Sequence, residues 1–454
     1  MTPRTADGRA ALVTDLYQLT MAQAYWREGM DAEATFDLFV RRLPPSRNYL
    51  VACGLADALA YLEAFHFPED ALAYLTTLGL FDDAFLQWLG RLRFTGHARA
   101  VLEGSVVFAG EPLLEVTAPI AEAQLAESFL LNQIAFQTAI ASKAARVVRA
   151  AQGRTVADFG MRRAHGADAA VQGARAMWIA GVDATSNVAA GHAFGIPVTG
   201  TMAHSYIEAH DDEAEAFRAF AACYPETVLL VDTYDTLRGV DRVIALASAL
   251  GEAFSVRALR LDSGNLGALA RDARRRLDAA GLHRVQLFAS SSLDEYRIAE
   301  LLAAGAPLDG FGVGTRMAVA KDAPALGAVY KLAAYAGRPR MKLAEGKATL
   351  PGLKQLWRRT DADGRFAGDT VATDEERLEG EPLLVEVLRD GRRTEAGREP
   401  LAAARARAAD ALARLPEPLH ALDAAAEPYP VTVSEGLAAL RDRTRAKLAA
   451  QHAA

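Results

Sequence analysis

Residues 256–290 read VRALRLDSGNLGALARDARRRLDAAGLHRVQLFAS and decide the fold class. The runs VRALRLD and RVQLFAS are short and mostly apolar, and the stretch between them repeats Leu and Ala at helical spacing. Apolar runs joined by a helix predict parallel strands that are buried on both faces of a sheet. The stretch therefore indicates an α/β fold.

The same alternation extends from Thr155 to about Tyr335. The further apolar runs are TVADFG, IPVTGTM, TVLLVDT, GFGVG and GAVYKLAAY, at 155–160, 196–202, 227–233, 310–314 and 327–335. Roughly seven or eight such units, without a dinucleotide-type glycine fingerprint, favour a closed or nearly closed βα barrel over an open sheet.

The regions on either side of this barrel have mixed character. The N-terminal region predicts a helix that begins at Thr14 or Asp15 and a strand in ATFDLFVRRLP, residues 34–44. The C-terminal region predicts a hairpin around Asp390-Gly391. A chain of 454 residues is long enough for two or three domains.

The net charge and the hydropathy of the sequence limit the kinds of partner that the protein is expected to bind. The net charge of −7 gives no sign of a nucleic-acid surface, so an anionic substrate would need a local group of Arg side chains. The first residues, MTPRTADGRAALVTD, lack the apolar core of a signal peptide, and we find no uncharged apolar run that is long enough to cross a bilayer. We therefore expect a cytoplasmic location, with no nucleic-acid and no membrane partner.

Polar residues follow almost every predicted strand, where a βα barrel carries its active site. The set comprises Arg162, Arg163, His165, Thr201, His204, Asp232, Thr233, Asp235, Arg260, Asp262, Ser263, Ser290, Ser291, Ser292, Thr315 and Arg316. A lone histidine is more often structural than catalytic, but the presence of the other polar residues at the predicted strand ends favours a reactive role for His204.

Several of these residues also have a structural interpretation. Ser292-Leu-Asp-Glu295 fits a helix capping box, and we favour capping over a site role for that serine. Asp232 and Asp235 fit N-caps or turns about as well as a site. The turn through Gly312, Gly314 and Thr315 is by itself a weak phosphate signal.

Arginines, carboxylates, hydroxyls and an imidazole suit an anionic substrate that carries phosphate. Mg²⁺ would be held between phosphate oxygens and carboxylates, with Asp232 or Asp235 as candidate ligands. The spacing of His and Cys residues does not suit zinc. These observations predict a barrel enzyme that acts on a phosphorylated anion, and they do not name the reaction.

The motifs together resemble the nicotinate phosphoribosyltransferase family. The matching stretches, in chain order, are TDLYQLTMAQAYW at 14, IASKAAR at 140, DFGMRRAHG at 158, GVDATSNVAAGHAFGIPVTGTMAHS at 181, LLVDTYDT at 229, LRLDSGN at 259, GFGVGT at 310 and AVYKLAAYAGRPRMKL at 328. The resemblance implies an irregular βα barrel joined to an α/β sandwich. We accordingly expect a sandwich domain in 1–140, the barrel in 141–337, and a C-terminal segment, 338–454, that packs on the N-terminal domain.

The resemblance also implies the reaction and its participants. The family joins nicotinate to phosphoribosyl pyrophosphate (PRPP) and couples this step to ATP hydrolysis through a phosphorylated histidine, which matches His204. Mg²⁺ is the implied cofactor, and a homodimer with a shared active site is the implied assembly. The contacts that the resemblance implies are Tyr17, Thr201 and Arg260 for nicotinate and Thr315 for the phosphoribosyl group. From their strand-end positions and chemistry we add Arg163 for nicotinate, Asp262 as a catalytic carboxylate, and Arg162, Ser263, Gly312 and Gly314 for PRPP phosphates.

The sequence departs from the family pattern at two places. Asn265 stands where the family usually has Asp, and the serines 290–292 replace a more Gly-rich loop. The alternatives are a nicotinamide phosphoribosyltransferase, whose motif has Gly in place of Arg163, and a sugar-phosphate barrel enzyme of another class. The latter would need a Schiff-base Lys or a Glu base at a strand end, which the runs do not provide.

Overall fold

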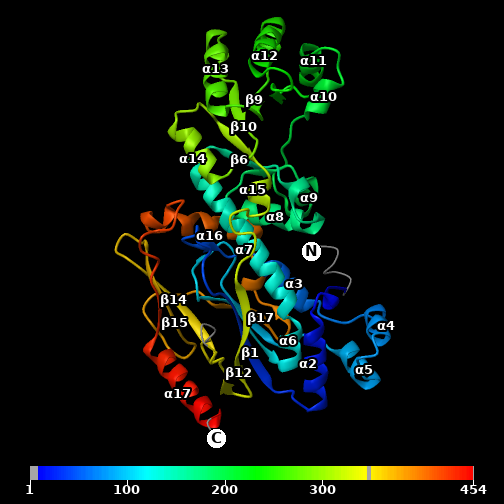
Figure 1. The fold of residues 1–454 in the computed structure, drawn as a ribbon, viewed down its shortest axis with the longest axis vertical. Helices are drawn as coiled ribbons and strands as arrows, with labels where there is room; N and C mark the ends of the chain where they lie inside the picture. The colour runs from blue at the N-terminus through cyan, green and yellow to red at the C-terminus, as the bar shows by residue number, and fades with distance from the viewer. Residues whose placement is uncertain (1–8, 345–348, 453–454) are drawn as a thin grey trace. The chain divides into compact units, whose positions relative to one another are not determined.

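The computed structural model describes residues 9–344 and 349–452 and divides into two compact units. Both ends of the chain form unit 1, which comprises the residues up to Ser142 and from Ala325 onward, and Lys143–Pro324 form unit 2. Figure 1 labels the elements of both units. None of the helices in these residues combines the length and the apolar character that crossing a bilayer requires.

Unit 2 contains a parallel sheet in the order β7-β6-β11-β10-β9-β8. Its strands are β6 (Thr155–Asp158), β7 (Ala184–Thr185), β8 (Val228–Leu230), β9 (Ala258–Leu261), β10 (Gln286–Ala289) and β11 (Gly310–Val313). The helices between and around them are α8 (Ala167–Ile179), α9 (Val188–Phe194), α10 (His204–Glu208), α11 (Glu213–Cys223), α12 (Thr236–Leu250), α13 (Leu266–Ala279), α14 (Glu295–Ala303) and α15 (Thr315–Ala318). The predicted α/β class and an irregular βα half-barrel are confirmed. The sheet is open, with β7 and β8 at its edges, and is not closed or nearly closed as the number of apolar runs had favoured.

Two apolar runs behave differently from the prediction. Residues 196–202 contribute only an isolated parallel bridge between Thr185 and Val198. The run 327–335 forms β12 (Ala328–Tyr335), which pairs antiparallel with β1 in unit 1. Within the described chain the parallel sheet therefore has 6 strands, rather than the larger number expected.

Unit 1 is built on two larger sheets and a short strand pair. The first sheet has the order β13-β12-β1-β5-β3-β17-β18. Besides β12 it contains β1 (Glu33–Val40), β3 (His97–Ala100), β5 (Pro112–Pro119), β13 (Arg338–Pro339), β17 (Val385–Arg389) and β18 (Arg392–Arg393). The second sheet, β16-β14-β15-β19, contains β14 (Lys354–Thr360), β15 (Phe366–Thr373), β16 (Glu381–Pro382) and β19 (Val431–Val433), and the pair is β2 (Leu50–Val51) with β4 (Val106–Val107). N-terminal and C-terminal segments thus share one sheet, as expected for the sandwich.

The helices of unit 1 come from both ends of the chain. They are α2 (Leu16–Arg27), α3 (Leu55–Glu63), α4 (Glu69–Thr77), α5 (Asp83–Arg91), α6 (Ile120–Leu125), the first part of α7 (Glu127–Ala150), α16 (Leu401–Ala413) and α17 (Glu435–His452). The core includes Phe36, which stacks on Tyr330 with ring centroids 4.8 Å apart. The predicted hairpin is confirmed: Asp390 and Gly391 both have positive φ, as a tight two-residue turn requires.

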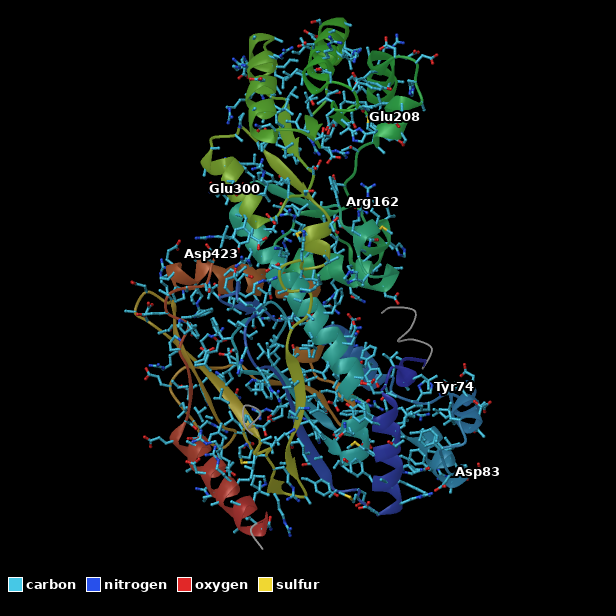
Figure 2. All side chains as sticks on the ribbon, viewed as in Figure 1. Tyr74, Asp83, Arg162, Glu208, Glu300 and Asp423 are labelled. Carbon is cyan, nitrogen blue, oxygen red and sulfur yellow. The ribbon has the colours of Figure 1, made fainter. Side chains whose placement is uncertain are left out.

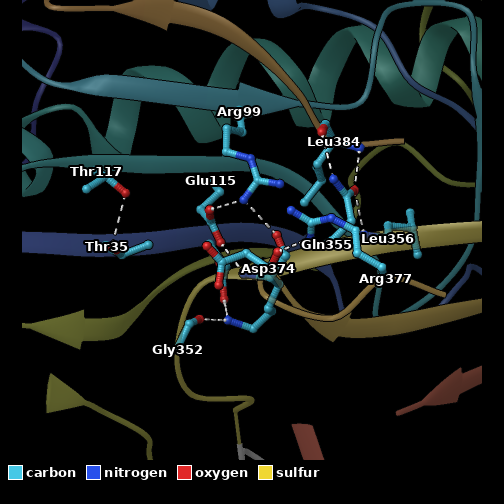
Figure 3. Close-up of polar contacts among 12 residues, drawn as sticks. Thr35, Arg99, Glu115, Thr117, Gly352, Gln355, Leu356, Asp374, Arg377 and Leu384 are labelled. Carbon is cyan, nitrogen blue, oxygen red and sulfur yellow. Dashed lines mark hydrogen bonds and ion pairs between the residues drawn. The ribbon is translucent and has the colours of Figure 1, made fainter. Parts of the chain in front are cut away.

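A buried polar layer joins the two sheets of unit 1 (Figure 3). Glu115 on β5 accepts a hydrogen bond from the backbone N–H of Lys354 at 2.8 Å and lies 3.4 Å from Arg99 Nη1. Lys354 Nζ pairs with Asp37 Oδ2 at 2.6 Å. Burial, followed by the charge of Asp37, raises the pKa of Glu115 to about 7. Two carboxyl groups and two cations therefore share one water-poor space.

Candidate active site

Because the strands of unit 2 are parallel, the loops that follow them meet at one edge of the sheet. His204 is the first residue of α10, and its Nδ1 lies 3.2 Å from Thr233 Oγ1 in the loop after β8. Its Nε2 lies 3.7 Å from Asp262 Oδ2 in the loop after β9. The ring is 39% exposed, so it is held on two sides and can still be reached from solvent.

Arg260 on β9 belongs to the same group of side chains. Its Nη1 donates to Thr201 Oγ1 at 3.0 Å, and its Nη2 lies 3.9 Å from Asp262 Oδ2. Burial lowers the pKa of the guanidinium, and the carboxylates of Asp262 and Asp232 oppose that effect. An arginine stays charged under such a shift, so the site contains a fixed cation.

Asp262 is fixed by its neighbours. Its Oδ1 accepts a hydrogen bond from Ser290 Oγ at 2.6 Å. Asp232 Oδ2 accepts from the N–H of Asp262 at 2.9 Å and from Ser263 Oγ at 2.6 Å, so the end of β8 fixes the turn after β9. Asp235 has a different role: its side chain accepts from the N–H of Arg238 and caps α12.

The residues present fit a magnesium ion that is held mainly by phosphate. No cluster of three or more His, Cys, Asp and Glu side chains suited to a metal occurs in the part of the chain that the structure describes. Asp232 Oδ1 is buried without a hydrogen-bond partner, and Asp262 is partly exposed beside it. One or two carboxylates plus substrate phosphates are the usual protein environment of Mg²⁺. Asp235 is occupied as a helix cap, which leaves Asp232 as the better of the two predicted candidates.

Arg162 and Arg163 lie in the 3₁₀ turn Met161–Arg163 that follows β6, and both side chains are exposed. Figure 2 labels Arg162. Its charge lowers the pKa of Arg260, which places the two cations near each other. Asp158 anchors this turn because its carboxylate accepts from the N–H of Gly160 and from Thr185 Oγ1, both at 2.7 Å.

A pocket of about 500 Å³ opens beside Ser263. It is lined by Ser263, Gly264, Leu266, Ser291, Ser292, Asp294, Tyr296, Arg297, Glu300 and Arg316. Ser291 and Ser292 have φ angles of 83° and 49°, so this serine loop keeps a left-handed backbone of the kind that glycine adopts more easily. The predicted cap is wrong: Asp294 caps α14 by accepting from the N–H of Arg297, and Ser292 lines the pocket.

The remaining predicted residues are placed as follows. Gly314 and Thr315 lie at the start of α15, where Thr315 is exposed. Gly312 packs closely against Phe159, because a Cβ at Gly312 would lie 2.5 Å from that ring. Asn265 caps α13 by accepting from the N–H of Ala268 at 3.3 Å, so the residue that departs from the family pattern has a structural use.

Tyr17 belongs to unit 1, where it lies on α2 with 48% of its surface exposed. Its hydroxyl is 3.4 Å from Gln18 Nε2, and Gln18 also reaches Glu127. Burial, opposed by the hydrogen bond from Gln18, raises the pKa of this hydroxyl. The phenol ring is therefore presented to solvent while its hydroxyl is held.

A parallel βα sheet whose carboxyl edge carries a histidine, arginines and carboxylates defines an α/β enzyme with its site at the strand ends. The family models of the nicotinate phosphoribosyltransferase N-terminal domain and of the nicotinate phosphoribosyltransferase family match residues 12–135 and 155–345. Nicotinate phosphoribosyltransferase pncB2 of Mycobacterium tuberculosis is 55% identical over 425 residues, which cover 94% of this chain and 92% of that protein. Nicotinate phosphoribosyltransferase of Bacillus subtilis is 44% identical over 83% of this chain and 79% of that protein.

The crystal structure of human nicotinic acid phosphoribosyltransferase superposes with a TM-score of 0.85 at 31% identity, over 95% of this chain and 99% of that one. The chain therefore belongs to the nicotinate phosphoribosyltransferase family and is an enzyme of that type. The resemblance inferred from the motifs is confirmed.

Proposed function

We propose that this enzyme joins nicotinate to PRPP, releases pyrophosphate and forms nicotinate mononucleotide, with ATP hydrolysis coupled through His204. The product is a precursor of NAD, so the step would begin NAD salvage from nicotinate. The names of the relatives support the reaction. The observation that carries the assignment of the site is the Thr201–Arg260–Asp262–His204 group, which joins the predicted acceptor site to the predicted phosphohistidine.

Arg260 is the residue that we assign to the nicotinate carboxylate. Its side chain is 15% exposed and is oriented by Thr201, and a guanidinium binds a carboxylate best through two parallel hydrogen bonds. Arg163 and Tyr17 are further proposed nicotinate contacts. A second cation favours an anionic acceptor over nicotinamide.

The transfer step needs no general base, because the pyridine nitrogen attacks with a lone pair and carries no proton. A bond forms from that nitrogen to the anomeric carbon while the bond from carbon to the pyrophosphate oxygen breaks. Asp262 is proposed to bind the ribose or to offset its developing positive charge. Arg162, Ser263, Gly312, Gly314 and Thr315 are the proposed phosphate-binding positions. Mg²⁺, held by phosphates with Asp232 and Asp262, would neutralise charge on the leaving pyrophosphate.

His204 is proposed to take the γ-phosphoryl group of ATP. A nitrogen–phosphorus bond forms as the bond to ADP breaks, and water later cleaves the new bond to release phosphate. Thr233 occupies Nδ1, so we expect Nε2 to be the phosphorylated atom. The added negative charge would lie near Asp262 and Arg260 and would change the affinity of the site for substrates and products.

We further propose a homodimer with a shared active site, in which Tyr17 of one copy contributes to the site of the other. The half-exposed ring of Tyr17 supports this assignment.

The deciding experiment supplies PRPP with nicotinate, nicotinamide or quinolinate, with and without ATP. We expect nicotinate mononucleotide as the main product and a faster reaction with ATP. If a mononucleotide forms with nicotinamide and not with nicotinate or quinolinate, the alternative function, a nicotinamide phosphoribosyltransferase, is established. Turnover of a sugar phosphate without any pyridine would point to a barrel enzyme of another class.

A further inference from the structure

Unit 2 contains a group of four charged side chains, three of them buried, that the proposed mechanism does not use. Lys143 and Arg146 lie one turn apart on α7, Glu295 is the first residue of α14, and Asp322 follows α15. Lys143 is 2% exposed, Arg146 is 4% exposed and Glu295 is fully buried.

The group is tightly paired. Lys143 Nζ lies 2.6 Å from Glu295 Oε2 and 2.8 Å from Asp322 Oδ1. Arg146 Nε donates to Glu295 Oε1 at 2.9 Å. Each oxygen of the Glu295 carboxylate therefore faces a different cation, and the charges of the four groups sum to zero.

Such a group is costly to bury, and apolar side chains of similar volume would often stabilise a fold as well. Its value lies in geometry, because a buried ion pair tolerates little displacement before a charge loses its partner. The position of the first turn of α14 is therefore fixed with respect to α7 and to the segment after α15.

That first turn carries part of the pocket wall. Tyr296 and Arg297 line the pocket beside Ser291, Ser292 and Arg316, and Glu300, labelled in Figure 2, lies one turn further along α14. Arg146 reaches Tyr296 directly: its Nη2 donates to the phenol oxygen at 3.2 Å, and its guanidinium carbon is 5.8 Å from the ring centroid. Asp294, the cap of the same helix, pairs with Arg316, and both residues line the pocket.

We propose that Lys143 and Arg146 are positioning residues that hold α14 and Tyr296 in the geometry that binds the phosphorylated ribose of PRPP. This inference rests on the proposed function, and it assigns Tyr296 as a wall of the PRPP pocket. The two cations do not touch the substrate. They act through Glu295 and through the phenol of Tyr296.

The test uses Arg146→Lys, which keeps the charge and most of the stem but cannot serve Glu295 and Tyr296 at the same time. We expect the KM for PRPP to rise about tenfold while kcat and the KM for nicotinate change less than about twofold. Tyr296→Phe keeps the ring and removes the oxygen that Arg146 holds, and we expect a rise of about threefold in the PRPP KM. Both variants are also titrated with PRPP alone by calorimetry.

Arg154→Lys is the matched control, since Arg154 donates to the carbonyl oxygen of Leu308 and does not line the pocket. It should lower thermal stability without moving the PRPP KM. An unchanged PRPP affinity in both Arg146→Lys and Tyr296→Phe would overturn the inference, as would an equal loss of affinity for both substrates. If the wild-type protein binds PRPP but makes no mononucleotide, the proposed function fails. The PRPP affinities of the wild type and the two variants, measured by calorimetry, then still test the positioning role. If the wild-type protein does not bind PRPP, the proposed function and the positioning role are both overturned.

Discussion

Arg260 Nη1 lies 3.0 Å from Thr201 Oγ1, although the two residues are 59 positions apart in the chain. The hydroxyl comes from the segment before α10 and the guanidinium from β9, so the hydrogen bond joins a loop to a strand of the parallel sheet. It fixes the direction of the cation that we assign to the nicotinate carboxylate.

Thr201→Val should raise the KM for nicotinate about five- to tenfold, because a charged donor loses its acceptor and the guanidinium is no longer oriented. Steady-state kinetics with nicotinate varied at saturating PRPP measure this change. Thr117→Val is the matched control: Thr117 pairs with Thr35 at 3.0 Å in unit 1, and its loss should affect stability without affecting the nicotinate KM. Equal KM changes in both variants would contradict the assignment of Thr201.

His204→Ala should abolish the stimulation by ATP and leave a slower, ATP-independent reaction. The imidazole is the proposed phosphoryl acceptor, whereas Arg260 and Asp262 remain to bind the other substrates. Incorporation of label from γ-³²P-ATP into the protein, measured beside turnover with and without ATP, checks both parts. Full stimulation by ATP in the variant would remove His204 from the mechanism.

Asp232 and Asp235 should respond differently to replacement by Ala. Asp232→Ala leaves the Asp262 N–H and the Ser263 hydroxyl without their acceptor, so kcat/KM for PRPP should fall at least about tenfold. Asp235→Ala removes a helix cap and should cost about 1 kcal/mol of unfolding free energy with kcat/KM unchanged. Magnesium titrations of both variants test the metal assignment: a raised magnesium requirement in Asp235→Ala would refute its role as a cap alone.

Tyr17→Ala and His204→Ala test the shared active site. If Tyr17 acts in the site of the partner copy, mixing the two variants, each expected to lack ATP-stimulated activity, should create dimers with one intact site. About a quarter of the wild-type ATP-stimulated activity is expected from random exchange of subunits. The mixture is assayed after reversible dissociation, with each variant treated alone as the control. Activity no higher than the mean of the two separate variants would place Tyr17 in its own site or outside the site.

The Glu115 layer predicts a pH dependence of stability. The pKa of Glu115 is raised to about 7 in the folded protein from an ordinary value near 4.5, so the folded state binds a proton that the unfolded state has lost. Stability should therefore decrease as the pH rises from about 5 to about 7, by as much as a few kcal/mol. Glu115→Gln mimics the protonated form, so the melting temperature of this variant should depend less on pH over this range. Glu111 has a raised pKa from burial and contributes in the same direction, so part of the slope should persist. An undiminished slope in Glu115→Gln would show that this carboxyl does not titrate there.

The sequence predicted the parallel sheet well because buried strands carry a local signature. The runs that became β6, β8, β9, β10 and β11 were all recognised from continuous apolar character. The same signature does not reveal the pairing partner, and for that reason the run at 327–335 was assigned to the barrel although it pairs with β1. The proline in the run at 196–202 removes a backbone donor, which is consistent with its single bridge.

The candidate site was predictable as a set of strand-end positions but not as a network. His204, Arg260 and Asp262 were selected from sequence, and the structure brings them together. The hydrogen bond from the Ser290 hydroxyl to the Asp262 carboxylate depends on loop conformation, which sequence spacing does not encode. Lys143 and Glu295 lie more than a hundred positions apart, and a buried ion pair of that kind leaves no local pattern.

The arrangement of unit 1 also constrains how the protein is made. Its first sheet places β12 and β17 beside strands from the start of the chain, and the whole of unit 2 is encoded in between. A ribosome therefore finishes unit 2 while β1 still lacks its neighbour β12 and β3 still lacks its neighbour β17. Until the last third of the polypeptide emerges, the nascent chain exposes unpaired strand edges that can aggregate. We therefore expect folding of the full chain to depend on chaperones more than folding of unit 2 expressed alone does.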